Sequence, residues 1–195
     1  MGREFFLANS DQSRLLLPAF IYTLSIVSYA QEVITTDTHR LDQVADGVYF
    51  ATGTGDIYTM SNALIIERED DIVIVDSHIT PAAGRALLDS IRTVSDKPVT
   101  TLINSHFHYD HSNGTPAFGD DLEIIGHEVT YEKLTGDPEN EHTYQSSLRR
   151  FDNTVARLES ELANATNAGE RGQIENQLNY WRRHVKAQSE IIFTP

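Results

Sequence analysis

Three histidines and one aspartate fall within six residues of this 195-residue chain. The run reads NSHFHYDHSNG over residues 104–114, and it directly follows a β-branched and apolar segment at residues 98–104. In α/β folds, the loops at the carboxyl ends of sheet strands usually hold the ligands. A surface cluster of polar residues is the alternative interpretation, but four ligand-type side chains directly after a strand favour a binding site.

The spacing of these residues indicates how metal ions could be held. His106 and His108 are two residues apart, so in an extended segment their side chains point the same way and both imidazoles can reach one ion. Asp110 and His111 are adjacent, so a turn aims them differently and they can serve a second ion. Nitrogen and carboxylate ligands without sulfur suit zinc, while iron and manganese are also compatible. The chain has no cysteine, which excludes thiolate nucleophiles and cysteine-based zinc sites.

Several short runs typical of β-strands surround this segment. Residues 47–52 are aromatic and β-branched, and residues 122–127 after the histidine run form another such segment. The apolar runs at residues 62–67 and 71–76 are separated by a charged turn, which predicts a hairpin. Together with residues 98–104, these runs predict a sheet with at least one face on a core.

A helix is predicted to begin at residue 81. Thr80 fits the N-cap position and Pro81 fits the first helical position. The apolar positions that follow recur at spacings of four, four and three residues: Ala83, Leu87, Ile91 and Val94. Strand, helix, strand, loop and strand in this order indicate an α/β fold with helices packed on a sheet.

The last third of the chain has the pattern of two helices. Apolar residues alternate spacings of three and four over residues 148–165 and again over residues 174–185. The run Asn167-Ala168-Gly169 predicts the end of the first helix. Two helices packed on each other or on the domain are the simplest interpretation, and a lid over an active site or a dimer contact is the alternative.

The N-terminus bears on the compartment. Residues 15–30 read LLLPAFIYTLSIVSYA, an uncharged and mostly apolar run after Arg14. Ser28 and Ala30 are small residues at the positions that a signal peptidase reads, so residues 1–30 are predicted to be a signal peptide and the protein to be periplasmic or secreted. An uncleaved anchor or a disordered leader is the alternative. The run is short of the ~20 apolar residues of a membrane span, so no stable span is expected after cleavage.

Charge narrows the choice of partners. The formal net charge is −14, and an acidic protein repels phosphate groups, so nucleic acid binding is not expected. A small-molecule substrate is the expected partner. The sequence leaves the oligomeric state open.

The run HFHYDH, the strand before it and the apolar strand that ends in Asp76 resemble the metallo-β-lactamase-fold superfamily. The resemblance covers about residues 41–130. It implies an α/β fold, the N-terminal half of an αββα sandwich with an inserted helical hairpin. The corresponding division is 31–140 for the half-domain, 141–188 for the hairpin and 189–195 for the start of a truncated strand.

The resemblance also implies roles for individual residues. His106 and His108 would match ligands of a first metal, Asp110 and His111 ligands of a second, and Asp76 the buried aspartate that orients the metal-binding loop. The implied chemistry is hydrolysis with two zinc ions, which lower the pKa of a shared water and polarise the scissile bond. Asp110 is then the candidate catalytic residue for proton transfer. Ester, thioester, lactone, lactam and phosphoester bonds fit this chemistry.

The superfamily supplies further histidine and aspartate ligands from its second half. His142 and His184 lie in helical sequence without the matching context, and His127 closes a strand near the rim. His39 and His78 are interpreted as ordinary polar residues, although His78 could lie near the pocket. The chain is therefore expected to be an N-terminal fragment that binds zinc weakly, has little activity and leaves one sheet face uncovered.

Two functions fit the sequence. The first is a zinc-dependent hydrolase, in which a metal-activated water attacks an ester, thioester, lactone or lactam bond. The alternative is a non-catalytic, truncated metal-site protein whose helical hairpin mediates association. The intact HFHYDH run favours the first, and the missing ligands favour the second.

Overall fold

The computed structural model describes residues 32–191. The predicted signal peptide at residues 1–30 lies outside the described residues, as do residues 192–195 of the predicted truncated strand. Both therefore stay predictions. Residues 189–191, the described part of that predicted strand, have no strand pairing, and Ile191 packs against an apolar cluster.

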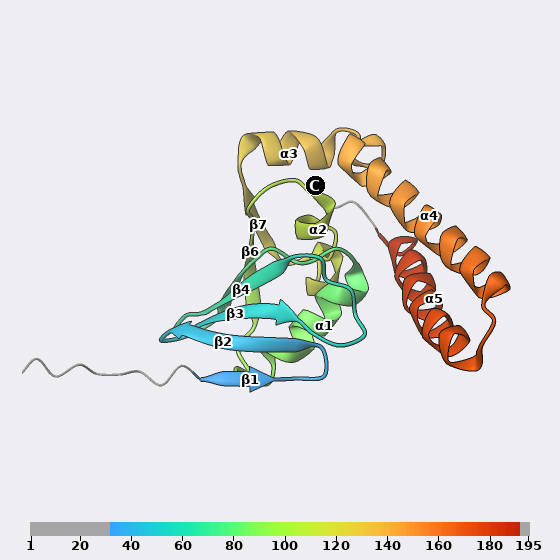
Figure 1. Cartoon of the computed structure of the whole chain (residues 1–195). Coiled ribbons are helices and arrows are strands. Elements are labelled where there is room, and N and C mark those ends of the chain that lie inside the picture. Colours follow the sequence, from blue (N-terminus) through green and yellow to red (C-terminus); the bar gives the residue numbers. More distant parts are fainter. Residues whose placement is uncertain (1–31, 192–195) are drawn as a thin grey trace, which may run out of the picture. The chain divides into compact units, whose positions relative to one another are not determined.

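One seven-stranded sheet carries the fold, and its strands lie side by side in sequence order (Figure 1). The first five strands pair antiparallel, whereas the fifth, sixth and seventh are parallel. The carboxyl ends of these three parallel strands therefore meet at one edge of the sheet. The strands are β1 (Val33–Thr35), β2 (His39–Ala45), β3 (Val48–Gly53), β4 (Asn62–Glu67), β5 (Ile72–Val75), β6 (Val99–Asn104) and β7 (Glu123–Gly126).

The predicted hairpin is present as β4 and β5, with Leu64 opposite Val75. Its charged turn is closed by an ion pair of 2.6 Å between the Arg68 guanidinium and the Asp71 carboxylate. The α/β class is thus confirmed, and β3 to β7 fall where apolar and β-branched runs predict them, whereas β1 and β2 were not predicted.

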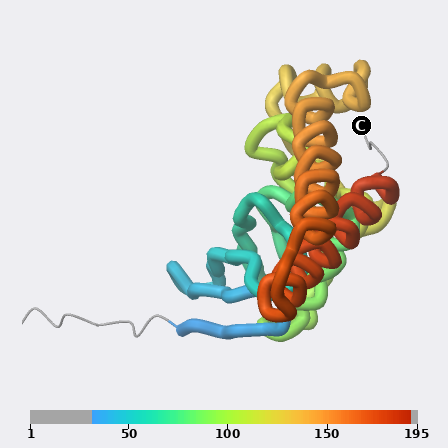
Figure 2. The backbone as a smooth tube through the Cα atoms, turned by 45° about the vertical axis from the view of Figure 1, so that its right-hand side comes forward, coloured from blue at the N-terminus to red at the C-terminus, as the bar shows by residue number. Residues whose placement is uncertain are grey.

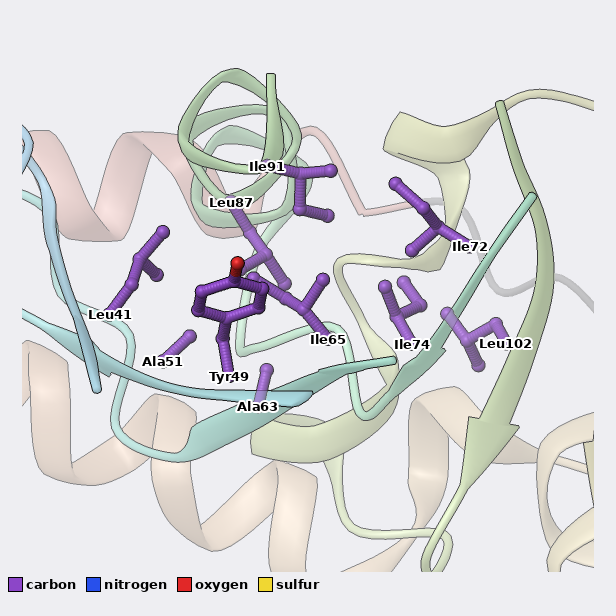
Figure 3. Close-up of a cluster of buried hydrophobic side chains, with 10 residues drawn as sticks. All are labelled: Leu41, Tyr49, Ala51, Ala63, Ile65, Ile72, Ile74, Leu87, Ile91 and Leu102. Atoms are coloured by element: carbon purple, nitrogen blue, oxygen red, sulfur yellow. The ribbon is translucent and has the colours of Figure 1, made fainter. Parts of the chain in front are cut away.

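The main core lies between the sheet and α1 (Pro81–Ile91) (Figure 3). Thr80 is the N-cap, since its hydroxyl accepts a hydrogen bond of 3.1 Å from the backbone N–H of Ala83. The helix ends at Ile91, so Val94 completes the apolar stripe from outside the helix. The buried side chains of this core are Leu41, Tyr49, Ala51, Ala63, Ile65, Ile72, Ile74, Leu87, Ile91 and Leu102.

The opposite face of the sheet carries an apolar row. Strand pairing places Phe50 beside Leu64, Leu64 beside Val75, Val75 beside Ile103 and Ile103 beside Ile125. The outer members are open to solvent: Phe50 is 37% and Ile125 46% exposed. This face agrees with the uncovered sheet face expected from the sequence.

Two long helices, α4 (His142–Asn164) and α5 (Ala168–Gln188), run side by side and are drawn orange and red in Figure 2. Leu158, Ile174 and Leu178 form the buried seam between them. The helices lie where the apolar spacing predicts them, but the interpretation of Asn167 was wrong. Its side chain accepts a hydrogen bond from the backbone N–H of Glu170 and so begins α5, because α4 has already ended at Asn164.

The helix pair packs against the loops at the carboxyl edge of the sheet. A second cluster joins Tyr144 and Phe151 of α4 to Ile79 and Tyr109 of those loops. The short elements around it are α2 (Tyr109–Ser112), the 3₁₀ turns Thr115–Phe118 and Pro138–Asn140, and α3 (Glu128–Thr135). Among residues 32–191, no helix is both long and apolar enough to span a bilayer.

Candidate metal centre

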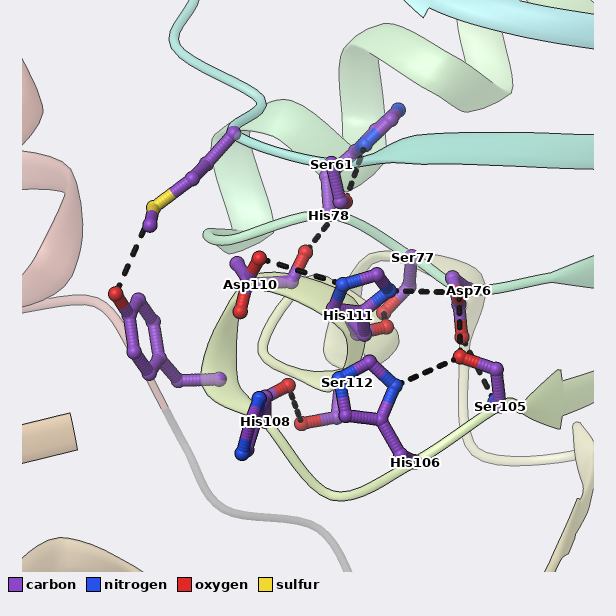
Figure 4. A network of polar contacts seen from close by, with 12 residues as sticks. Ser61, Asp76, Ser77, His78, Ser105, His106, His108, Asp110, His111 and Ser112 are labelled. Carbon is purple, nitrogen blue, oxygen red and sulfur yellow. Dashed lines mark hydrogen bonds and ion pairs between the residues drawn. The ribbon is translucent and has the colours of Figure 1, made fainter. Parts of the chain in front are cut away.

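The histidine run lies on the loop that leaves β6 and on the short helix α2 (Figure 4). The neighbouring parallel strand β5 ends in a second loop, which holds Asp76 and leads into α1. Because β5 and β6 are parallel, the two loops leave the sheet at the same edge. The structure thus brings Asp76 next to the histidine run, as predicted.

Asp76 ties the two loops together. Its Oδ1 accepts a hydrogen bond of 2.8 Å from the backbone N–H of Ser105. Its Oδ2 accepts one of 2.8 Å from the Ser105 hydroxyl and lies 2.7 Å from Nδ1 of His111. Burial alone would raise the pKa of Asp76, but the hydrogen bonds from His111 and Ser105 outweigh it and hold the pKa below its usual value. Asp76 is therefore an anion at neutral pH, with fixed donors on both oxygens.

His111 lies between two carboxylates. Its Nδ1 contacts Asp76, and its Nε2 is 3.3 Å from Oδ2 of Asp110. Burial works to lower the pKa of His111, but hydrogen bonds and charge from Asp110 and Asp76 raise it to about 9. The pKa of Asp110 is also shifted: burial would raise it, but the hydrogen bond and charge of His111 lower it below its usual value. A metal ion that binds His111 must therefore replace a proton on the ring.

His106 has one nitrogen free for a ligand bond. The Ser105 hydroxyl has a single proton and donates it to Asp76, so at 2.9 Å it can only accept from Nδ1 of His106. This fixes the proton of neutral His106 on Nδ1 and leaves the Nε2 lone pair for a metal. Burial, and then the charges of His111 and His108, lower the pKa of His106, which favours the neutral ring.

The three imidazoles of the run gather in one place. The His106 ring lies with its centroid 4.6 Å from that of His108 and 4.1 Å from that of His111. Within residues 32–191, however, no three His, Asp or Glu side chains converge as a ready set of ligands. Asp110 and His111 pair with each other. The donor types fit zinc, while the role of each residue as a ligand stays a prediction.

Residues 105–114, which carry the histidine run, are called the ligand loop. They pack very closely against the loop after β5. The backbone N–H of Ser77 donates to the His111 carbonyl at 2.8 Å, and that of Gly114 donates to the His78 carbonyl at 3.0 Å. A Cβ on Gly114 would come within 1.8 Å of the Ser77 carbonyl oxygen. Only glycine fits this approach, and so Gly114 allows the two loops to meet.

A hollow lies beside the site. A cavity of about 280 Å³ follows the loop between β3 and β4. Met60 and Ser61 line it, and they also contact the ligand loop: Ser61 donates to the Asp110 carbonyl at 2.5 Å, and the Tyr109 hydroxyl lies 3.5 Å from Sδ of Met60. Arg150 of α4 reaches the same Tyr109 hydroxyl at 3.2 Å.

The other histidines are placed apart from the run. His127 caps α3 through Nδ1 and is exposed, His142 is exposed at the start of α4, and His184 lies among aromatic side chains of the helix pair. Within residues 32–191, none of these three joins the run in a metal-holding group.

His39 and His78 are more than ordinary polar residues, because both are fully buried and bonded to each other beneath the site. Ser61 and Ser105 were also missed. The serine next to His106 and the proximity of His78 to Asp76 were the available signals.

Comparison with known proteins shows the family to which the chain is similar. The family model described as the metallo-beta-lactamase superfamily matches residues 57–170. The chain is 35% identical over 65 residues to a linear primary-alkylsulfatase of Pseudomonas sp. (strain ATCC 19151), covering 33% of this chain and 12% of that protein. It is 36% identical over 67 residues to the 2,4-dinitroanisole O-demethylase subunit beta of Nocardioides sp. (strain JS1661), covering 34% and 21%.

Solved structures of similar fold include a metallo beta lactamase from Erythrobacter litoralis. It has a TM-score of 0.45 and 23% identity, over 52% of this chain and 47% of that chain. A stereoselective inverting sec-alkylsulfatase from Pseudomonas sp. has a TM-score of 0.47 and 24% identity, over 57% and 18%. The chain thus spans less than half the length of each of these proteins.

Proposed function

Because the family model matches more than half of its length, the chain belongs to the metallo-beta-lactamase superfamily, and we propose that it is a zinc-dependent hydrolase. That superfamily is of hydrolase type. The observation that carries the proposal is the gathering of three imidazoles and one carboxylate on the single loop after β6. The reaction is attack of an activated water on an ester, thioester, lactone or lactam bond.

The chain's donors suit two zinc ions. His106 and His108 would hold one ion, and Asp110 and His111 the second. Iron or manganese would also accept these donors. When bound, the metal supplies a Lewis acid that lowers the pKa of a water and polarises the scissile bond.

The chain's own residues set up the proton transfer. The Asp110 carboxylate is ionised at neutral pH, since contact with His111 lowers its pKa against the effect of burial. It can therefore take a proton from the attacking water. Asp76 holds the His111 ring in place through Nδ1, and such support of a ligand commonly changes metal affinity by about 10- to 100-fold.

The small-molecule substrate would occupy the hollow of about 280 Å³ that Ser61 lines, and Ser61 also donates a hydrogen bond to the Asp110 carbonyl. The relatives named as alkylsulfatases add sulfate esters to the bonds worth testing. Nucleic acid is an unsuitable partner for a chain of net charge −14. Export to the periplasm or the medium belongs to the same proposal, and fusion of residues 1–30 to a reporter enzyme tests it.

The second candidate is a non-catalytic metal-site protein whose helical hairpin mediates association. One observation favours it: within the described part of the chain, no three ligand side chains converge. Under this hypothesis the chain would bind zinc without hydrolysing any of the candidate bonds.

A hydrolysis screen with and without a chelator separates the two. The purified chain is supplied with zinc and offered an ester, a thioester, a lactone, a lactam and a linear alkyl sulfate. Because zinc binds weakly, we expect slow, chelator-sensitive hydrolysis of at least one of them at a high zinc concentration, and His106→Ala or Asp110→Ala should lower it at least ~100-fold. The exposed His127→Ala variant is the matched control and should retain the activity.

Hydrolysis that persists in both variants or in the chelator would contradict the metal mechanism. Zinc binding without any hydrolysis would favour the second candidate.

A further inference from the structure

Two histidines lie buried beneath the ligand loop, one on β2 and one in the turn after β5. His39 and His78 are both 0% exposed. Their Nε2 atoms are 3.1 Å apart, and their rings stack with centroids separated by 5.1 Å. Neither belongs to the candidate metal ligands, and the hydrolytic mechanism uses neither. The proposed mechanism therefore leaves the function of this buried, hydrogen-bonded pair unexplained.

The hydrogen-bond directions through this pair are fixed from one end. The Ser61 hydroxyl donates its one proton to the Asp110 carbonyl at 2.5 Å, so it can only accept from Nδ1 of His78, which lies 3.3 Å away. A neutral His78 with its proton on Nδ1 offers a lone pair on Nε2. His39 must then donate from its own Nε2. Each step follows from the one before.

The contacts of His39 on the side away from His78 are consistent with this direction of hydrogen bonding. With its proton on Nε2, His39 accepts at Nδ1, and the hydroxyls of Thr38 and Ser90 lie 3.0 and 3.1 Å from that atom. Burial lowers the pKa of His39 to about 4 and that of His78, with a further contribution from His39, to about 3. Both rings are therefore neutral at pH 7, as a one-way chain of hydrogen bonds requires.

The backbone at His78 is held in an unusual conformation. His78 has φ 69° and Asp76 has φ 64°, in the left-handed region that residues other than glycine rarely adopt. Such strain persists where the surroundings fix it, and it clusters at functional sites. Here the left-handed turn directs the Asp76 carboxylate to the ligand loop and the His78 ring to His39 and Ser61.

We propose that His39 and His78 are positioning residues, which hold the ligand loop through a one-way chain of hydrogen bonds from Ser90 of α1 to the Asp110 carbonyl. The chain links α1, β2, the turn after β5 and α2, so it joins the core to the candidate metal centre. The inference rests on the proposed function only in taking Asp110 as a metal ligand.

A second metal site at the pair itself is not supported. Zinc in proteins usually takes three or four protein ligands. At His39 and His78 only two rings meet, and their Nε2 atoms are hydrogen-bonded to each other at 3.1 Å, which leaves neither of these nitrogens for a metal.

The chain of hydrogen bonds is tested by ¹⁵N NMR of the histidine rings in the full chain without metal. We expect His78 protonated on Nδ1 and His39 on Nε2 at pH 7. In Ser61→Ala the hydroxyl acceptor is lost, while the hydrogen bond between His78 and the Ser61 backbone remains. The His78 ring signal should therefore shift with its tautomer kept, whereas Ser61→Thr should leave the signal as in the wild type. The ring of His184, buried in the helix pair, is the control and should not change.

The reverse tautomers, a charged ring in the pair at pH 7, or a His78 signal that Ser61→Ala leaves unchanged would overturn the proposal. The wild-type spectrum alone decides the first two, even if the Ser61→Ala variant does not fold.

A zinc titration of the same samples tests the link to the metal centre. Ser61→Ala and His39→Leu should weaken zinc binding at least ~10-fold, while His39→Gln, which keeps a donor, should weaken it less. Equal affinity in Ser61→Ala and wild type would overturn the positioning role. Failure of the wild type to bind zinc would count against the proposed function instead, and the tautomer measurement would still decide the hydrogen-bond chain.

Discussion

At the scale of single residues, Asp76 links the two loops of the candidate site. It accepts hydrogen bonds from the Ser105 backbone, the Ser105 hydroxyl and the His111 ring. Its pKa is depressed because these donors outweigh the effect of burial. The carboxylate therefore orients His111 and helps to keep the ring charged when no metal binds.

Asp76→Asn should weaken zinc binding by about 10- to 100-fold, because His111 loses the charge that orients it. The fold should survive, since asparagine tolerates the left-handed backbone at this position. Isothermal titration calorimetry measures the change. Asp71→Asn is the matched control, because it removes a carboxylate paired with Arg68 at the outer turn and should leave zinc affinity unchanged.

The unmodified chain should bind zinc only weakly, with dissociation constants well above those of complete sites. The described residues offer four candidate ligands for two ions, and zinc usually takes three or four protein ligands each. Calorimetry showing two tightly bound ions per chain would contradict this expectation.

Short-range spacing allowed His106, His108, Asp110 and His111 to be predicted, and the resemblance to the superfamily added Asp76. The structure brings these side chains together. The His39–His78 contact could not be predicted from the sequence, because 39 residues separate the two histidines and a single histidine in a strand does not indicate its partner. Ser61 was hidden for the same reason, since it contacts Asp110 across 49 residues.

At the scale of elements, the contact between the ligand loop and the loop after β5 depends on Gly114. Gly114→Ala should destabilise the protein by about 1–3 kcal/mol or more, because the added Cβ meets the Ser77 carbonyl oxygen at 1.8 Å. Urea unfolding measures the loss. Gly172→Ala is the control: its Cβ would meet nothing within 4 Å, and alanine should stabilise α5 by up to ~1 kcal/mol. Equal stability of wild type and Gly114→Ala would refute the close approach.

The helix pair should lose stability in acid through His184. Burial lowers the pKa of His184 to about 4, from 6.5 in the unfolded chain. The fold favours the neutral ring, so its contribution is complete above pH 6.5 and is lost as pH falls toward 4. The melting-temperature difference between wild type and His184→Gln should therefore shrink from pH 7 to pH 4. The exposed His142→Gln is the control, and a constant difference for His184→Gln would contradict the account.

Element positions were predictable where hydrophobic period and capping agree, as at Thr80 and α1. Asn167 was misread because the asparagine of an Asn-Ala-Gly run suits either the end of one helix or the start of the next. The structure decides through the bond from the Glu170 N–H to the Asn167 side chain.

At the scale of the whole molecule, the exposed apolar row on the sheet should promote self-association. Phe50 and Ile125 lie at its outer ends and are both open to solvent. Phe50→Ser with Ile125→Ser should reduce the associated fraction in sedimentation velocity. Val129→Ser removes an equally exposed side chain on α3 and should have little effect. Unchanged association in the double variant would show that another surface is responsible.

The central claim is that the loop after β6 is a metal centre. The fold, the close contact of the two loops and the buried histidine chain all serve to position that loop. A zinc titration of the chain, followed by ¹⁵N NMR of its histidine rings, tests this claim most directly. The ring nitrogens of His106, His108 and His111 should shift on zinc addition, and Asp110→Ala should reduce the His111 shift. Zinc-induced shifts confined to other histidines, or none at all, would contradict the assignment.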